Sequence, residues 1–225
     1  EEMSYSRYYY TFKFAKNGDI VFSNDNGMIY QLDPASGEIK NEFVLDDSYI
    51  SDFTTVGDSL VIVGGNSVKE YSLESGKELG NIKPLESEVL YENNSNFYGI
   101  SNIFSDDKTI YYTSTTGLYK YKLGEKEVEQ IIEGSLSSIG DDNMHISTFV
   151  VGKDNTFLAC GQDYNSYEVG TSIIRFTYSA DTPKVPENQI TVYSLYENYQ
   201  IRQNIVLYQK ANPDIYIKLE IGTSG

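Results

Sequence analysis

The sequence is poor in the side chains on which most catalytic and metal sites depend. Its 225 residues include one cysteine, Cys160, one histidine, His145, and no tryptophan. A single thiol excludes an internal disulfide and a cysteine-based metal cluster. One imidazole cannot build a metal site alone and has no evident nucleophile beside it, so we expect His145 to be structural or exposed. We therefore expect no enzyme activity, no metal and no cofactor.

Basic residues are also scarce. The chain has 17 Lys and Arg against 33 Asp and Glu, which gives a formal net charge of −16. Binding to nucleic acid depends on basic side chains that displace counterions from phosphates, so the charge excludes nucleic acid as a partner. It is equally unsuited to an anionic membrane surface.

Long apolar runs are absent as well. No stretch approaches the roughly 20 apolar residues that a membrane helix needs. The chain opens with Glu1-Glu2-Met3-Ser4, which lacks the basic and apolar regions of a signal peptide. Either such a peptide was removed with upstream residues or the protein is cytosolic, and the composition does not choose between them.

Paired carboxylates are present, as glycoside hydrolysis would require. The pairs are Asp46–Asp47, Asp106–Asp107 and Asp141–Asp142. Each pair falls between strand-like runs, so we expect solvated turn residues. Cys160 ends the strand-like run Thr156 to Cys160, which predicts a small buried hydrophobic side chain.

Tyrosine is the abundant aromatic residue, with 21 Tyr beside 10 Phe. Rings of this kind favour pleated sheets, where they pack against neighbours on adjacent strands. Some could instead offer stacking faces to sugars or peptides. The groups that could do so are Tyr8-Tyr9-Tyr10, Tyr111-Tyr112 and the pair Tyr164 and Tyr167.

A short strand, a tight turn and a second strand recur four times along the chain. The turns are marked by Gly18, Asp58, Asp107 and Asp154, so the spacings are 40, 49 and 47 residues. Propeller blades have about this length. The paired runs are 10–14 with 20–22, 51–56 with 60–63, 100–104 with 110–112, and 146–151 with 157–159.

Each pair is followed by a third strand, and the first three by a fourth. The third strands are expected at 27–32, 66–73, 117–123 and 172–176, and the fourth at 43–45, 79–82 and 128–132. Clusters of Asp, Pro and Gly separate these runs, as hairpin turns require. We expect an all-β fold, a β-propeller of four blades of four antiparallel strands, either a small ring or a truncated larger one. A β-sandwich does not require this repeated order.

The segment Ile29 to Glu38, IYQLDPASGE, resembles the repeats of quinoprotein-type propellers. This resemblance implies the propeller fold. The blade tryptophan of that family is absent, because the chain contains no Trp, so a quinone cofactor is not supported.

The C-terminal part has a different pattern, and the expected division is 1–180 for the blades, 181–189 for a linker and 190–225 for an α/β tail. Residues 190–195 form a strand pattern. Ile201, Ile205 and Tyr208 follow with helical spacing, after Asn198 as N-cap and before Asn212-Pro213 as a stop. Residues 215–221 then alternate as a second strand. Alternatively, residues 190–195 supply the outer strand of the fourth blade.

These last residues resemble the start of an extracellular solute-binding protein, the receptor of an ABC importer, most clearly in Lys210-Ala211-Asn212-Pro213-Asp214. The likeness covers about 33 residues. It implies a lipid-anchored parent protein on the cell surface, whose ligand is a protein or a small molecule such as a saccharide. It also implies membrane subunits of the importer as partners. The two lobes of such a receptor would be missing, so the chain would be truncated and its ligand-binding residues remain unknown.

The sequence thus predicts a non-catalytic binding or scaffold propeller module of a cell-surface solute-binding protein, related to carbohydrate import. The alternative is a free-standing propeller that scaffolds protein assembly in the cell envelope. A propeller lyase or glycosidase is the least supported, since the expected cluster of His, Arg and carboxylates is not evident.

Overall fold

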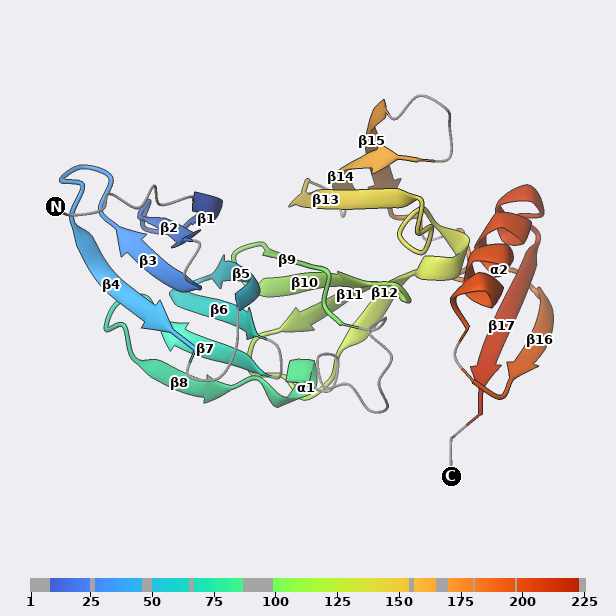
Figure 1. Ribbon diagram of the computed structural model, residues 1–225, viewed down its shortest axis with the longest axis horizontal. Coiled ribbons are helices and arrows are strands. Elements are labelled where there is room, and N and C mark those ends of the chain that lie inside the picture. Colours follow the sequence, from blue (N-terminus) through green and yellow to red (C-terminus); the bar gives the residue numbers. More distant parts are fainter. Residues whose placement is uncertain are drawn as a thin grey trace, which may run out of the picture. The chain divides into compact units, whose positions relative to one another are not determined.

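Antiparallel sheets built from consecutive strands make up most of the fold (Figure 1). The structure, a computed structural model, describes residues 9–24, 27–45, 50–64, 67–86, 99–153, 156–164, 170–179, 181–196 and 198–222. Within these residues four such sheets follow one another along the chain, and we call them blades 1 to 4. The chain has the β-propeller fold class that the repeats predict, with a C-terminal α/β tail.

The first three blades have four strands each, hydrogen-bonded in sequence order. Blade 1 contains β1 (Tyr9–Phe14), β2 (Ile20–Asn24), β3 (Met28–Leu32) and β4 (Ile39–Val44). Blade 2 contains β5 (Ile50–Val56), β6 (Ser59–Gly64), β7 (Val68–Ser72) and β8 (Glu78–Asn81), and a short helix α1 (Lys83–Glu86) follows it. Blade 3 contains β9 (Asn102–Ser105), β10 (Thr109–Ser114), β11 (Gly117–Lys122) and β12 (Glu129–Glu133).

The fourth blade differs from the other three. It contains β13 (Met144–Val151), β14 (Thr156–Asp163) and β15 (Gly170–Thr177), so it has three strands in the described part of the chain where four were expected. A 3₁₀ turn, η1 (Gly134–Leu136), precedes it. Residues 190–195 are not its outer strand.

Those residues belong to a β-α-β unit. The strand β16 (Asn188–Ser194) pairs in parallel with β17 (Ile215–Ile221), and the helix α2 (Tyr199–Ala211) connects them. Parallel neighbours need a crossover of this kind, whereas an outer blade strand would pair antiparallel with β15. The β-α-β prediction is therefore confirmed, and the alternative blade assignment is wrong.

By compactness the chain divides into two units. The first comprises Glu1–Leu90, Ile103–Ile110 and Lys122–Glu127, and the second comprises Tyr91–Asn102, Tyr111–Tyr121 and Val128–Gly225. The expected division at 180 and 190 remains a prediction.

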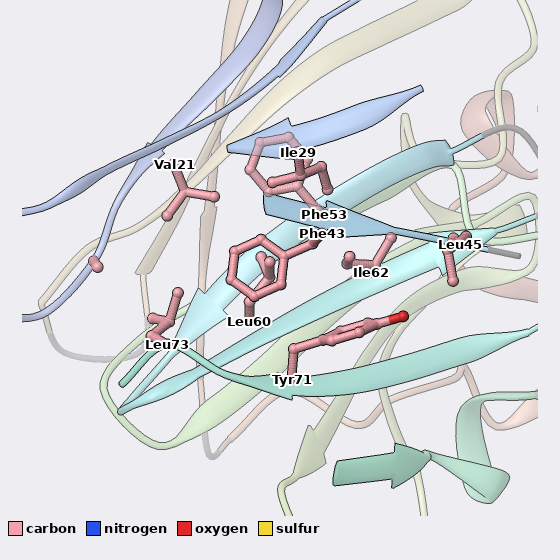
Figure 2. Close-up of a cluster of buried hydrophobic side chains, with 10 residues drawn as sticks. Val21, Ile29, Phe43, Leu45, Phe53, Leu60, Ile62, Tyr71 and Leu73 are labelled. Atoms are coloured by element: carbon pink, nitrogen blue, oxygen red, sulfur yellow. The ribbon is translucent and has the colours of Figure 1, made fainter. Parts of the chain in front are cut away.

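Blades 1 and 2 bury a shared hydrophobic layer inside the first unit (Figure 2). Blade 1 contributes Val21, Ile29 and Phe43, and blade 2 contributes Leu60 and Ile62, with exposed fractions of 0 or 1%. Burying one such side chain fully stabilises the fold by about 1.5–3 kcal/mol. The alternation of the strands places these residues on one face of each sheet.

Side chains also join the blades through backbone atoms. Thr55 Oγ1 of β5 donates to the carbonyl of Phe14 of β1 at 2.9 Å. Asp52 accepts the N–H of Ile103 of β9 at 3.0 Å, and burial raises the pKa of that carboxyl. In the second unit, Asn102 of β9 donates to the carbonyl of Ile146 of β13. First strands of neighbouring blades are thus linked by hydrogen bonds.

Leu60→Ala tests the layer between blades 1 and 2. We expect it to lower the free energy of unfolding by about 2–5 kcal/mol, because the removed side chain leaves a cavity in a tightly packed layer. Leu79→Ala is the matched control in the same blade, since Leu79 is 59% exposed. Urea unfolding measures both variants, and the free energy of unfolding of the control should lie within about 0.5 kcal/mol of that of the parent protein. Equal losses would contradict the assigned core.

Candidate functional site

A small cavity lies in the second unit, between α2, β17, the β10–β11 turn and the connection from blade 3 to blade 4. Its volume is about 200 Å³. The lining combines charged, hydroxyl and aliphatic side chains: Thr115, Thr116, Glu133, Ser135, Gly140, Asp142, Tyr199, Arg202, Ile205, Val206, Tyr216, Ile217 and Leu219.

The helix α2 is held at this place by its cap and by two buried glutamines. Asn198 caps the helix as expected, because its side chain accepts the N–H of Ile201 at 3.2 Å. Gln209 is 2% exposed, donates to the carbonyl of Ser135 at 2.8 Å and accepts the N–H of Ile217. One side chain therefore ties the helix both to η1 and to β17.

Gln203 makes the second connection. Its amide donates to Asp141 at 3.1 Å, and its carbonyl oxygen accepts the N–H of Asp142 at 3.2 Å. Asp141 is 2% exposed and also lies 3.6 Å from the ammonium of Lys210. The expectation of solvated turn residues is wrong for Asp141, which is buried and contacts Gln203 and Lys210 of α2, whereas Asp142 is partly exposed.

The buried face of α2 agrees only in part with the expected one, since it includes Ile205 but not Tyr208. The spacing of Ile201, Ile205 and Tyr208 placed the contact stripe along those residues, but Tyr208 is 46% exposed. The buried residues of the helix are Gln203, Ile205, Val206 and Gln209. A search for apolar residues at helical spacing does not find this stripe in full, because two of its residues, Gln203 and Gln209, are polar.

Charges around the cavity influence one another. Burial raises the pKa of Asp142, and the neighbouring Asp141 adds to this, while Arg202 opposes it. Burial also raises the pKa of Tyr216, with a contribution from the carboxylate of Glu133. Glu133 accepts the N–H and hydroxyl of Ser135, so it also caps η1.

Its size decides what this cavity can do. Pockets for drug-sized ligands have volumes of about 300–1,000 Å³, so this one is too small for an oligosaccharide. Much of its polar lining is already engaged, as Glu133 is by Ser135 and the Asp142 N–H by Gln203. Within the described residues, no group of three or more His, Cys, Asp or Glu side chains could hold a metal ion. The arrangement is best suited to fixing α2 against η1.

A second polar cluster lies inside blade 1. Asp19 is 3% exposed and accepts hydrogen bonds from Lys40 at 2.7 Å, Gln31 at 2.6 Å and Asn17 at 2.9 Å. The hydrogen bond from Lys40 lowers the pKa of Asp19, although burial opposes it. All three donors come from the same blade, so the cluster stabilises that sheet.

The two scarce residues lie in blade 4. His145 is exposed, as expected, and its ring lies 4.8 Å from that of Tyr164. Cys160 is a free thiol and only half-buried, which corrects the expectation of a buried side chain. Its position on β14 explains this, because Phe157 and Ala159 point to the buried face and Cys160 to the other.

The tyrosine and carboxylate expectations have mixed outcomes. Tyr112 is fully buried and stacked on Tyr119, and Tyr111 makes an edge contact with Phe157, so both have packing roles. Tyr164 is 43% exposed and donates to Gln162. Asp106 and Asp107 are exposed turn residues, as expected.

The remaining residues of these groups are not described by the structure. They are Tyr8, Tyr167 and the pair Asp46–Asp47, together with the side chains of Tyr9 and Tyr10.

Comparisons with known proteins add little to this picture. No protein-family model matches the sequence, and no curated protein matches it. The computationally designed Ika4 protein is similar in structure, with a TM-score of 0.46 and 14% identity over 77% of this chain and 94% of that one. The computationally designed Ika8 protein has a TM-score of 0.44 and 10% identity over 73% of this chain. The chain spans 48% of the Ika8 chain, and neither likeness bears on function.

Among the described helices, none is long and apolar enough to cross a membrane.

Gln209→Ala tests the attachment of α2. The change leaves the Ser135 carbonyl and the Ile217 N–H without this partner, and each unsatisfied buried group costs about 1–3 kcal/mol. We expect faster hydrogen exchange in α2 and β17, with little change in blades 1 and 2. Gln200→Ala is the control, because Gln200 is exposed on the same helix. Unchanged exchange in the Gln209 variant would show that the glutamine does not hold the helix.

Asp142→Asn tests the electrostatics of the cavity. A raised pKa means that the folded state binds the proton more tightly than the unfolded state, so ionised Asp142 costs stability near pH 7. We expect the variant to be more stable than the parent protein at pH 7. The difference should shrink as the pH falls through the raised pKa of Asp142, and urea unfolding between pH 7 and pH 4 measures it. A variant that is less stable at pH 7 would contradict this assignment.

Proposed function

We propose that this chain is a non-catalytic propeller module of a cell-surface solute-binding protein of an ABC importer, followed by the first β-α-β unit of its binding domain. The ligand class is carbohydrate, or another small molecule, and the parent protein is anchored outside the cell. The support is the position of the unit β16–α2–β17 after the blades, together with its sequence Lys210-Ala211-Asn212-Pro213-Asp214.

The main support for this proposal is that the parallel pair of β16 and β17 leaves apolar side chains of β16 exposed. Parallel sheets are normally covered on both faces by helices. Here β16 pairs only with β17 in the described residues, and exposed apolar side chains lie on both of its faces. Ile190 is 50% exposed and Tyr193 is 64% exposed, and the period of two directs them to opposite sides. A third parallel strand beside β16, with its own helix, would cover them.

The order of such a sheet agrees with the proposal. In doubly wound α/β domains with the strand order 2-1-3-4-5, the first strand has the second strand on one side and the third on the other, and ligands bind at this switch point. Here β16 is the first strand and β17 the second. The edge of β16 away from β17 is therefore the place for the next strand, and the ligand site would need residues that follow β17.

The acidic charge is compatible with a neutral ligand. A net charge of −16 repels nucleic acid, whereas sugars are bound by hydrogen bonds and aromatic stacking. The cavity beside α2 is then part of the joint between the blades and the binding domain. Its buried glutamines fix the first helix of that domain to the loop that follows blade 3.

The continuation of the gene beyond Gly225 gives the direct test. We expect a two-lobed domain there, and the extended protein should bind a saccharide in a calorimetric screen of oligosaccharides. The 225-residue chain should not bind the same sugar. A reading frame without such a domain would overturn the proposal and favour a free-standing envelope scaffold.

Ile190→Lys provides a matched stability test. In the 225-residue chain the side chain is half exposed, so we expect a change within about 0.5 kcal/mol. In the extended protein the same charge would be buried at the sheet, and a buried unpaired charge lowers stability by several kcal/mol. Thermal unfolding of both proteins measures the contrast. Equal small effects would mean that nothing covers this face of β16.

A further inference from the structure

The cavity beside α2 lies wholly within the second unit, because every residue of its lining belongs to that unit. One side of it is formed where the β10–β11 turn and the loop after blade 3 meet through their backbones. The N–H of Gly134 donates to the carbonyl of Thr116 at 2.9 Å, and the N–H of Gly140 donates to the carbonyl of Gly134 at 3.2 Å. A Cβ atom added at either glycine would lie 2.6 Å from a backbone atom, so the contact requires glycine at both positions.

The rest of the lining is held in place as well. It comes from α2 and β17, and Gln209 bonds α2 both to η1 and to β17. The cavity is therefore formed by contacts that need no ligand. A preformed cavity of this kind favours binding, because little conformational freedom is lost when a ligand enters.

Size and apolar lining restrict the ligand. The volume of about 200 Å³ corresponds to about seven water molecules, since one water occupies about 30 Å³ in the liquid. A ligand of that size has only a few carbon atoms. The aliphatic side chains of the lining, which would contact its apolar part, are Ile205, Val206, Ile217 and Leu219.

Two acceptors of the lining are not used by the fold. Within the described part of the chain, Asp142 is hydrogen-bonded only through its N–H, to Gln203, so its carboxylate receives no donor. The phenol of Tyr216 makes no hydrogen bond with the described residues either. Burial raises the pKa of both groups, and a neighbouring carboxylate adds to each shift, Asp141 for Asp142 and Glu133 for Tyr216. A positively charged donor in the cavity would offset both effects.

We propose that this cavity binds a small ligand that carries an ammonium group on a short aliphatic body, which is the chemistry of an aliphatic amine or amino acid. The ammonium group donates to the carboxylate of Asp142, with the phenol of Tyr216 as a further acceptor, and the aliphatic part packs against α2 and β17. The net charge of −16 favours a cationic group over an anionic one. The site needs no residue beyond Gly225, so it does not rest on the proposed importer function.

An NMR titration of the 225-residue chain with valine, isobutylamine and isovalerate tests the site. The three compounds share a branched aliphatic body, and only isovalerate lacks the ammonium group. We expect the ammonium compounds to shift the signals of α2, η1 and β17, and isovalerate to bind at least about tenfold more weakly in Kd. Tighter binding of valine than of isobutylamine identifies an amino acid, whose carboxylate would lie near Arg202 of the lining, and the reverse order identifies an amine.

Asp142→Asn removes the charge that the ligand would contact, and it should weaken binding of the ammonium compounds at least about tenfold in Kd. Asp214→Asn is the matched control, because it removes the same charge from an exposed carboxylate outside the lining, and it should bind as the parent protein does. Tyr216→Phe keeps the ring and removes only the hydroxyl group, so we expect a smaller loss. Circular dichroism confirms that each variant is folded.

Three outcomes would overturn the proposal. If neither valine nor isobutylamine shifts any signal of α2, η1 or β17, the cavity does not take such a ligand. If isovalerate binds as tightly as the other two, the ammonium group is not recognised. If the Asp142 variant binds like the parent protein, this carboxylate is not the partner of the ligand.

Discussion

The need of each β-sheet to bury both of its faces is the constraint on which this structure depends. A blade of four short strands has two faces, and one sheet alone cannot bury either. Blades 1 and 2 solve this by setting Val21 and Ile29 of one sheet against Leu60 and Ile62 of the next, all almost fully buried. Every internal blade of a propeller therefore presents two apolar faces.

The apolar layers set the strength of the blade contacts, and polar bonds set their register. Each buried aliphatic side chain contributes about 1.5–3 kcal/mol, whereas a typical hydrogen bond contributes about 0.5–1.5 kcal/mol net. The bond from Thr55 to the Phe14 carbonyl and that from the Ile103 N–H to Asp52 are therefore minor in energy. They still fix which residues face each other, because a shift of one residue would leave the buried carboxylate of Asp52 without the N–H of Ile103. Burial raises the pKa of Asp52, because removing the ionised carboxyl group from water is unfavourable.

Features that repeat or follow a local code could be predicted from the sequence. The turn spacing located the four hairpins, and Asn198 and Asn212-Pro213 bounded α2, because caps and turns depend on residues close in the chain. The expectations that failed depend on distant residues. Asp141 lies in a turn by local rules, but Gln203, 62 positions away, buries it. Cys160 sits in an apolar strand, but the alternation of β14 places it on the face opposite to the buried Phe157 and Ala159. The contact stripe of α2 was predicted only in part: Ile205 belongs to it as expected, but two of its four buried residues are glutamines.

The buried glutamines also bear on how the two kinds of fold are joined. A linker composition at 181–189 favours a loose connection, yet α2 is fixed to the loop after blade 3 by Gln209, Gln203 and the Lys210–Asp141 pair. An amide is suited to such a joint, since it satisfies a carbonyl and an N–H together without burying a charge. Carboxylate or lysine at position 209 would satisfy only one of the two groups and add a desolvation cost. The joint therefore gives the β-α-β unit a definite place beside η1, and a ligand that displaced α2 would have to break both amide contacts first.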